Sequence, residues 1–255
     1  MAQIELLYGR HAVLEALRAG RRPIRRVLLG QGVRQQAGII AEIIAAALER
    51  GCPTSEAPRQ AFDIAGDVNH QGVLAEAGPY RYVDLDEVLT APGEPFCLAL
   101  DHLQDVQNLG TLLRTAEAMA VTGIILPERR AAGVTPAVVN ASSGAVEHLN
   151  IALVTNLVQA LERLKKSGVW IVGLDAAPNA VPLPRADLSG PLALVVGAEG
   201  AGLSRLTRET CDWLLAIPMC GEVASLNAAV AGSIALFAAR QARGWPPVGL
   251  GRGEQ

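Results

Sequence analysis

Three stretches of the chain decide its fold: DHLQDVQNLGTLLRTAEA (101–118), LALVVGAEGAGLS (192–204) and IPMCGEVASLNAAVAGSIALF (217–237). Each brings a hydrophobic run to an end in Gly, Asn or Ser, and the first and third then enter an apolar helical run. In α/β proteins, ligands bind at the loops that follow strand ends and at helix N-termini. These stretches therefore predict a ligand site built from three loops.

From Phe96 onward, short apolar segments alternate with amphipathic ones. Strands of this kind are typical of a parallel sheet that helices cover on both faces, which makes the fold class α/β. The expected strands are 96–101, 123–127, 151–154, 169–175, 192–197 and 213–218. The expected helices are 109–120, 136–141, 155–167, 204–210 and 226–241.

Residues 1–78 are predicted to form a separate, smaller α/β unit. Its expected helices are 8–19, 36–50 and 58–65, and its expected strands are 25–30 and 70–77. Segment 79–95 combines four Pro and Gly residues with four acids, so we interpret it as a linker. The second domain then spans 96–243, and residues 244–255 are expected to form a flexible tail.

Composition excludes several classes of protein. No apolar run of the 255 residues reaches the roughly 18–20 that a membrane span needs, and the N-terminus lacks the layout of a secretion signal. We therefore expect a cytoplasmic protein without a membrane partner. The four Cys show no CxxC pair and no His at ligand spacing, so we expect buried or incidental thiols and no metal site.

Charge is unevenly distributed, although the net value is −3. Residues 1–34 contain seven Arg but only two Glu, and RRPIRR at 21–26 is the densest basic segment. Contact with RNA phosphates and a merely solvated surface explain this segment equally well. The candidate RNA-binding residues are Arg10, Arg21, Arg22, Arg25 and Arg26.

Polar residues in the three stretches are candidates for the site. Asn108 lies where an N-cap is expected before Leu109, and a helical wheel places Arg114 almost opposite the apolar face of its helix. Ser225 is placed to cap a helix from Leu226, and Asn227 is unusual in a helix otherwise made of apolar and small residues.

The second stretch has glycines at 197, 200 and 202, which permit close backbone approach to a ligand. Its G-x-x-G-x-G spacing is neither a dinucleotide fingerprint nor a P-loop. Glu199 lies within this loop, so we expect its carboxylate to accept hydrogen bonds from the ligand or from an arginine; a plain turn glutamate is the alternative.

Together the three stretches resemble, in order and separation, the three motifs of the SpoU-type ribose 2′-O-methyltransferases of the SPOUT superfamily. YGRHAVLEAL at 8–17 and HQGVLAEA at 70–77 resemble the N-terminal domain of the RlmB-type subfamily, which methylates a guanosine ribose in large-subunit ribosomal RNA. The resemblance covers about residues 5–243. It implies S-adenosylmethionine as methyl donor, a homodimer, a trefoil knot in the C-terminal domain and an RNA-binding N-terminal domain like ribosomal protein L30.

The resemblance also assigns residues. The donor site is expected at Gly197, Ile217, Met219 and Leu226. The polar active-site set is expected at Asn108, Arg114, Glu199, Ser225 and Asn227.

Because arginine hardly ever loses its proton, we expect Arg114 to stabilise the developing alkoxide or to clamp a phosphate rather than to act as the base. Facing away from its own core, Arg114 is placed to reach a site on the partner subunit. Three alternatives stay open: a transfer-RNA ribose methyltransferase or a resistance enzyme that modifies ribosomal RNA elsewhere, a catalytically silent RNA-binding assembly factor, and the disfavoured nucleotide-cofactor oxidoreductase.

Overall fold

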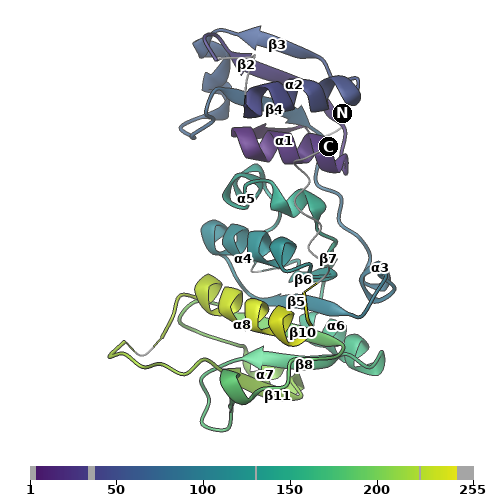
Figure 1. Ribbon diagram of the computed structural model, residues 1–255, viewed down its shortest axis with the longest axis vertical. Helices are drawn as coiled ribbons and strands as arrows, with labels where there is room; N and C mark the ends of the chain where they lie inside the picture. The colour runs from purple at the N-terminus through teal and green to yellow at the C-terminus, as the bar shows by residue number, and fades with distance from the viewer. Residues whose placement is uncertain (1–3, 34–37, 130, 224, 246–255) are drawn as a thin grey trace.

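The computed structural model describes residues 4–33, 38–129, 131–223 and 225–245. They form two α/β units stacked along the long axis of the molecule (Figure 1). The sequence predicted a parallel-sheet domain preceded by a small α/β domain, and this fold class is confirmed. The predicted tail lies almost wholly outside the described residues.

The N-terminal unit is a four-stranded sheet in the order β1-β4-β2-β3. Strands β1 (Glu5–Tyr8) and β4 (Val73–Ala77) are antiparallel, as are β4 and β2 (Ile24–Gly30), while β3 (Thr54–Ala57) is parallel to β2. Helices α1 (Arg10–Ala19) and α2 (Ile39–Glu49) pack together, and η1 (Arg59–Ala65) is a 3₁₀ helix.

The C-terminal unit is a seven-stranded, wholly parallel sheet in the order β7-β6-β5-β10-β8-β11-β9. Its central pair, β5 and β10, is buried along its full length. The strands are β5 (Phe96–Asp101), β6 (Gly123–Pro127), β7 (Ile151–Val154), β8 (Trp170–Leu174), β9 (Val181–Pro182), β10 (Leu192–Gly197) and β11 (Trp213–Ala216).

Helices cover both faces of this sheet (Figure 1). Helices α4 (Val106–Ala118), α5 (Pro136–Ala141) and α8 (Ala228–Ala242) lie on the face toward the N-terminal unit, together with η2 (Ala145–His148). Helices α6 (Leu157–Lys166) and α7 (Arg205–Thr210) lie on the other face, and η3 (Leu183–Arg185) follows β9. Among the described residues, no helix is long and apolar enough to cross a bilayer.

Several elements differ from the expectation. Tyr8 ends strand β1 rather than beginning a helix, because Gly9 turns the chain at a φ of +93° before α1 starts. The short strands β1, β3 and β9 were not predicted. Segment 79–95 contains helix α3 (Leu85–Leu89), which begins at a capping box on Asp84, and its Tyr80 is buried, so this segment is packed against the C-terminal unit.

A buried ion pair joins the two units. The Arg22 guanidinium, whose side chain is fully buried, contacts Glu147 of η2, which is equally buried, and also Glu5 at 2.5 Å. Arg21 donates to the Glu147 carbonyl at 3.1 Å and to Asn150 Oδ1 at 2.9 Å. A prediction is corrected here: Arg22 cannot contact RNA because its charge is buried and paired, and Arg21 is also engaged between the units.

Close backbone approach strengthens this contact. Gly144 has a φ of +85°, and a Cβ at this position would lie 2.6 Å from Glu15 Cβ of α1. The Tyr80 hydroxyl donates to the carbonyls of Val146 and Leu149 at 3.2 and 2.8 Å, and burial raises the pKa of this phenol. The N-terminal unit is therefore docked on η2 and its flanking residues.

Breaking the buried pair from one side is expected to be costly. Glu147→Gln leaves the Arg22 charge buried without a full counter-charge, so it should lower the free energy of unfolding by about 3–5 kcal/mol. Urea denaturation of the whole chain measures this change. The matched control is Glu76→Gln, which removes the partly exposed pair with Arg26 and should cost about 0–1 kcal/mol. Equal losses in both variants would contradict the special role of the Arg22–Glu147 pair.

Candidate active site

A cavity of about 580 Å³ opens at the carboxyl ends of β10, β8 and β11. Parallel sheets place ligands at this edge, where the loops after neighbouring strands converge. Seven of the predicted site residues line the cavity: Gly197, Glu199, Ile217, Met219, Ser225, Leu226 and Asn227. Asn108 and Arg114 are not in its wall.

The glycine loop after β10 folds back on itself. Ala198 and Gly202 exchange backbone hydrogen bonds at 3.1 and 2.9 Å, and Gly200 and Gly202 have positive φ angles of 76° and 64°. A Cβ at Gly197 would lie 2.2 Å from the carbonyl carbon of Gly202, so only glycine fits there. The loop thus presents backbone to the cavity at close range.

Asp101 fastens this loop to the neighbouring strand. It ends β5, is 1% exposed, and its Oδ2 accepts a hydrogen bond from the Ser204 backbone N–H at 2.7 Å. Its Oδ1 lies 2.5 Å from His102 Nδ1. The sequence marked Asp101 only as a strand end; its position at the end of a fully apolar strand was the signal that a buried carboxylate needs partners there.

The start of α4 corrects the predicted cap. Asp105 is the N-cap, and its carboxylate accepts from the Asn108 backbone N–H at 2.7 Å. Asn108 therefore lies inside the first turn, because an aspartate three residues earlier already satisfies that N–H. Its side chain is left available for contacts outside the helix.

Asn108, Glu199 and Asn227 form one hydrogen-bonded cluster. Asn108 Nδ2 donates to Glu199 Oε2 at 3.1 Å, and Asn227 Nδ2 donates to Asn108 Oδ1 at 2.8 Å and to Glu199 Oε1 at 3.3 Å. Each of the three predicted motifs therefore contributes one side chain to this cluster. Within the described residues the donors to Glu199 are two asparagine amides, whereas the prediction was a ligand or an arginine.

The start of α8 also differs from the prediction. The helix begins at Ala228, not at Leu226, and Asn227 rather than Ser225 is its N-cap. Asn227 Oδ1 accepts from the backbone N–H groups of Ala229 and Val230 at 2.9 and 3.2 Å. One asparagine therefore caps the helix with its oxygen and serves the cluster with its nitrogen, while Ser225 is exposed on the cavity wall.

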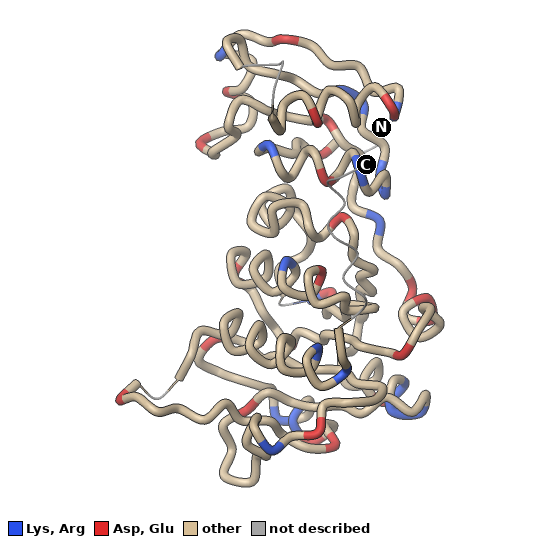
Figure 2. Tube along the Cα trace, in the orientation of Figure 1, with Lys and Arg blue, Asp and Glu red and all other residues tan. Residues whose placement is uncertain are grey.

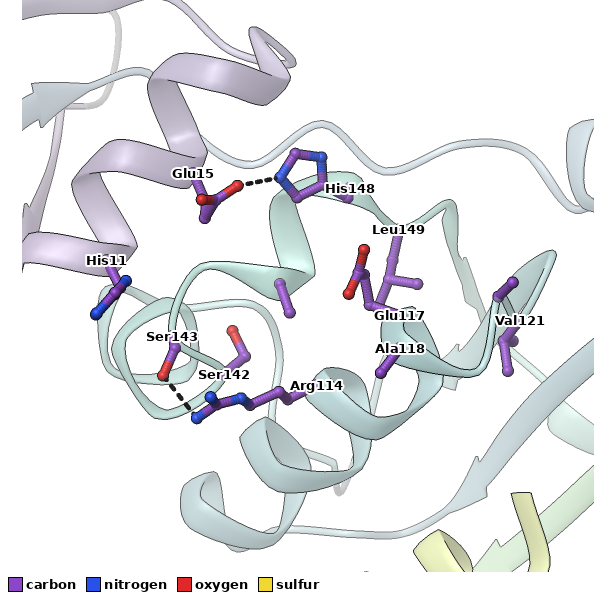
Figure 3. A pocket seen from close by; sticks show the side chains of 12 residues that line it. His11, Glu15, Arg114, Glu117, Ala118, Val121, Ser142, Ser143, His148 and Leu149 are labelled. Atoms are coloured by element: carbon purple, nitrogen blue, oxygen red, sulfur yellow. Dashed lines mark hydrogen bonds and ion pairs between the residues drawn. The ribbon is translucent and has the colours of Figure 1, made fainter. Parts of the chain in front are cut away.

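Arg114 faces away from its own core, as the helical wheel predicted. Its side chain lies in the wall of a second cavity, of about 840 Å³, between α1, α4 and η2 (Figure 3). Its Nη1 donates to Ser143 Oγ at 3.1 Å, and His148 Nε2 lies 2.8 Å from Glu15 Oε2 across the same cavity. Within one chain, Arg114 is therefore separated from the Glu199 cluster.

Comparison with known proteins agrees with this architecture. Residues 95–237 match the model of the SpoU rRNA methylase family, and residues 6–83 match the model of RNA 2′-O ribose methyltransferase substrate binding. The chain is 40% identical over 251 residues to the Bacillus subtilis protein YacO, named as a TrmH-family tRNA/rRNA methyltransferase, with 97% of this chain and 98% of YacO covered. The chain belongs to the SpoU family.

Two solved structures are similar to this SpoU methyltransferase over different shares of its chain. The AdoMet-bound rRNA methyltransferase from Sinorhizobium meliloti is 29% identical to this chain, with a TM-score of 0.76. The match covers 93% of this chain and 87% of the Sinorhizobium chain. The A. aeolicus TrmH/SpoU tRNA modifying enzyme is also 29% identical, but covers 62% of this chain and 80% of its own, with a TM-score of 0.53. The protein is an S-adenosylmethionine-dependent RNA methyltransferase of this family.

The 580 Å³ cavity fits this cofactor in size and lining. Ligand pockets of about 300–1,000 Å³ with mainly apolar walls and a few polar groups are usual for molecules of this size. The apolar side chains of Ile217, Met219 and Leu226 line it beside the exposed backbone of the glycine loop. Behind the wall, burial raises the pKa of Cys211 to about 12, so this thiol stays protonated and is a packing group.

The two roles of Asn227 are separable by substitution. Asn227→Ala removes the cap and should lower the free energy of unfolding by about 1 kcal/mol, whereas Asn227→Ser retains a capping oxygen and should keep nearly wild-type stability. Both variants lose the amide donor and should lose methyl transfer. Thermal unfolding and single-turnover kinetics measure the two effects. Full activity in Asn227→Ser would show that the amide donor is dispensable.

Proposed function

We propose that this SpoU methyltransferase transfers a methyl group to the ribose 2′-hydroxyl of a guanosine in large-subunit ribosomal RNA. The observation that carries the choice of RNA is the docked N-terminal unit. Likeness to the Sinorhizobium meliloti rRNA enzyme extends over both units, whereas likeness to the A. aeolicus tRNA enzyme spans 62% of the chain. A protein of this family that works in the cytoplasm meets both RNAs, so specificity must reside in the protein.

Residue roles follow from where the side chains lie. Gly197, Ile217, Met219 and Leu226 are proposed to hold the methyl donor, which supplies an electrophilic methyl group when bound. Asn108, Glu199, Ser225 and Asn227 are the polar set beside it. The Asn108 and Asn227 amides hold the Glu199 carboxylate in one orientation, so that it can accept a proton or hydrogen bond at a fixed place.

Arg114 has a different role in this proposal. An arginine guanidinium donates hydrogen bonds but does not remove protons at neutral pH. Arg114 is therefore placed to stabilise the developing alkoxide or to clamp an adjacent phosphate. Since it lies away from the cavity of its own chain, we propose that it serves the site of a partner subunit.

The exposed face of α8 supports a homodimer. Val230, Ile234 and Phe237 are apolar, follow helical spacing and are 37–50% exposed. Helix α4, which carries Arg114, packs beside α8, and Thr115 and Ser233 hydrogen-bond across them at 2.9 Å. Contiguous exposed apolar surface of this kind marks protein interfaces. A second copy seated here would bring Arg114 toward the other cavity, and the trefoil knot implied by the resemblance belongs to the same proposal.

Of the five arginines proposed to contact RNA, three remain candidates: Arg10, Arg25 and Arg26. Arg25 and Arg26 are exposed on β2, although Arg26 is paired with Glu76, and Arg10 is half-buried and donates to the Gln71 carbonyl at 3.1 Å. Figure 2 shows basic and acidic positions interspersed along both units rather than gathered on one face. Recognition by shape together with a few arginines fits this distribution better than bulk charge.

Methyl transfer from labelled S-adenosylmethionine to unmodified RNA tests the function. We expect incorporation at one guanosine of large-subunit RNA, located by ribose-methylation-sensitive primer extension. Arg114→Ala should lower the rate by about 10²–10³-fold, as for removal of a transition-state donor. The control Arg163→Ala removes an exposed arginine of α6 and should retain the rate.

The same assay separates the alternatives. Incorporation into transfer RNA alone would replace the proposed substrate. Donor binding without incorporation into any RNA would support a silent assembly factor.

Charge on the α8 face should disrupt the proposed dimer. Phe237→Asp should shift the protein to monomer in sedimentation velocity and abolish methyl transfer, because each site then lacks the partner's arginine. The control Leu48→Asp makes the same change at an exposed apolar residue of α2 and should stay dimeric and active. A fully active Phe237→Asp monomer would contradict the shared site.

Mixed dimers provide the complementary measurement. A dimer of one Arg114→Ala subunit and one Glu199→Ala subunit keeps one intact composite site. Partial recovery of activity is therefore expected, and its absence would count against sharing.

A further inference from the structure

Asp175 occupies the centre of the strand edge that forms the 580 Å³ cavity. It directly follows β8, which lies between β10 and β11 in the sheet. The ends of those two neighbours supply Gly197 and Ile217 to the cavity wall. The Asp175 backbone N–H donates to the Leu215 carbonyl at 3.0 Å, so the position of the residue is fixed by the sheet.

The carboxylate of Asp175 is held from one side only. Its Oδ2 forms an ion pair with Arg208 Nη2 of α7 at 2.7 Å, and its side chain is 12% exposed. Among the described residues, none donates a hydrogen bond to Oδ1. Asp175 and Arg208 both line the cavity, as do the apolar residues of the third motif.

We infer that Asp175 binds the ribose diol of the S-adenosylmethionine adenosine through Oδ1, with Arg208 holding the carboxylate in place. The inference rests on the donor site proposed above. A carboxylate oxygen accepts hydrogen bonds from hydroxyl groups, and an acid at the end of a parallel strand is a general solution for holding a ribose.

Charge favours the diol over the ammonium of the methionine part. The Arg208 guanidinium already neutralises Asp175, so the pair presents a neutral, polar surface with a free acceptor and further N–H donors. Hydroxyl groups, which both donate and accept, match that surface. Glu199, by contrast, has only neutral amide partners among the described residues and keeps its charge uncompensated.

Calorimetric titration with S-adenosylhomocysteine and its 2′-deoxy and 3′-deoxy adenosyl analogues tests the inference. The wild-type chain should bind at least one deoxy analogue about tenfold more weakly than the ribose ligand, since a hydrogen bond to a charged group is lost. Asp175→Ala removes the acceptor, so it should weaken the ribose ligand by a similar factor and bring the ratio between ribose and deoxy ligands close to one.

The ratio separates recognition from a merely structural effect. Glu209→Gln, which breaks the exposed pair with Arg205 on the same helix α7, is the matched control and should retain the wild-type ratio. Equal wild-type affinity for all three ligands, or undiminished discrimination in Asp175→Ala, would overturn the role of Asp175 while leaving the donor site intact. Wild-type protein that fails to bind S-adenosylhomocysteine at all would instead overturn the donor site.

Discussion

The Asp101 carboxylate is the contact on which the catalytic end of the sheet depends. It is buried at the end of a central strand, and it accepts the backbone N–H of Ser204 at the far end of the glycine loop. Because a buried charge is tolerated only with good donors, movement of the loop would remove one of the two partners of this carboxylate, the other being His102. This one bond sets where the loop turns, and Glu199 in that loop is thereby carried to Asn108 and Asn227.

The contact between the two units also depends on a buried charge. A buried ion pair contributes little net stability compared with apolar packing, but it is demanding in geometry. Arg22 and Glu147 meet in one arrangement of the two units, and Gly144 removes the side chain that would hold α1 away. The pair therefore mainly determines the arrangement in which the two units dock.

Much of the C-terminal unit could be predicted from the sequence because its strands are short, apolar and bounded by turn residues. All six expected strands are present, and the boundaries of β5, β6, β7 and β10 coincide with those expected. Strands β1, β3 and β9 were missed, since two to four residues carry no measurable alternation. The predicted helix caps were displaced by three residues at α4 and by two at α8, because Asp, Asn and Ser near a helix start compete for the same role.

The motifs predicted residues that the structure brings together, but not how their side chains are arranged. The motifs named Asn108, Glu199 and Asn227 without revealing that their side chains bond one another. For the arginines, local charge density gave the wrong result at Arg22, whose partner Glu147 lies 125 positions away. A run of basic residues does not show which arginine stays in solvent and which one is buried against an acid far away in the sequence.

The docking of α1 against η2 gives the molecule a fixed internal length. Helix η2 contacts Arg21 and Arg22 of the N-terminal unit through Glu147, and its Ala145 and His148 line the cavity that contains Arg114. An RNA that engages both units, as we propose, therefore has to present its two contact points at the spacing that this docking sets.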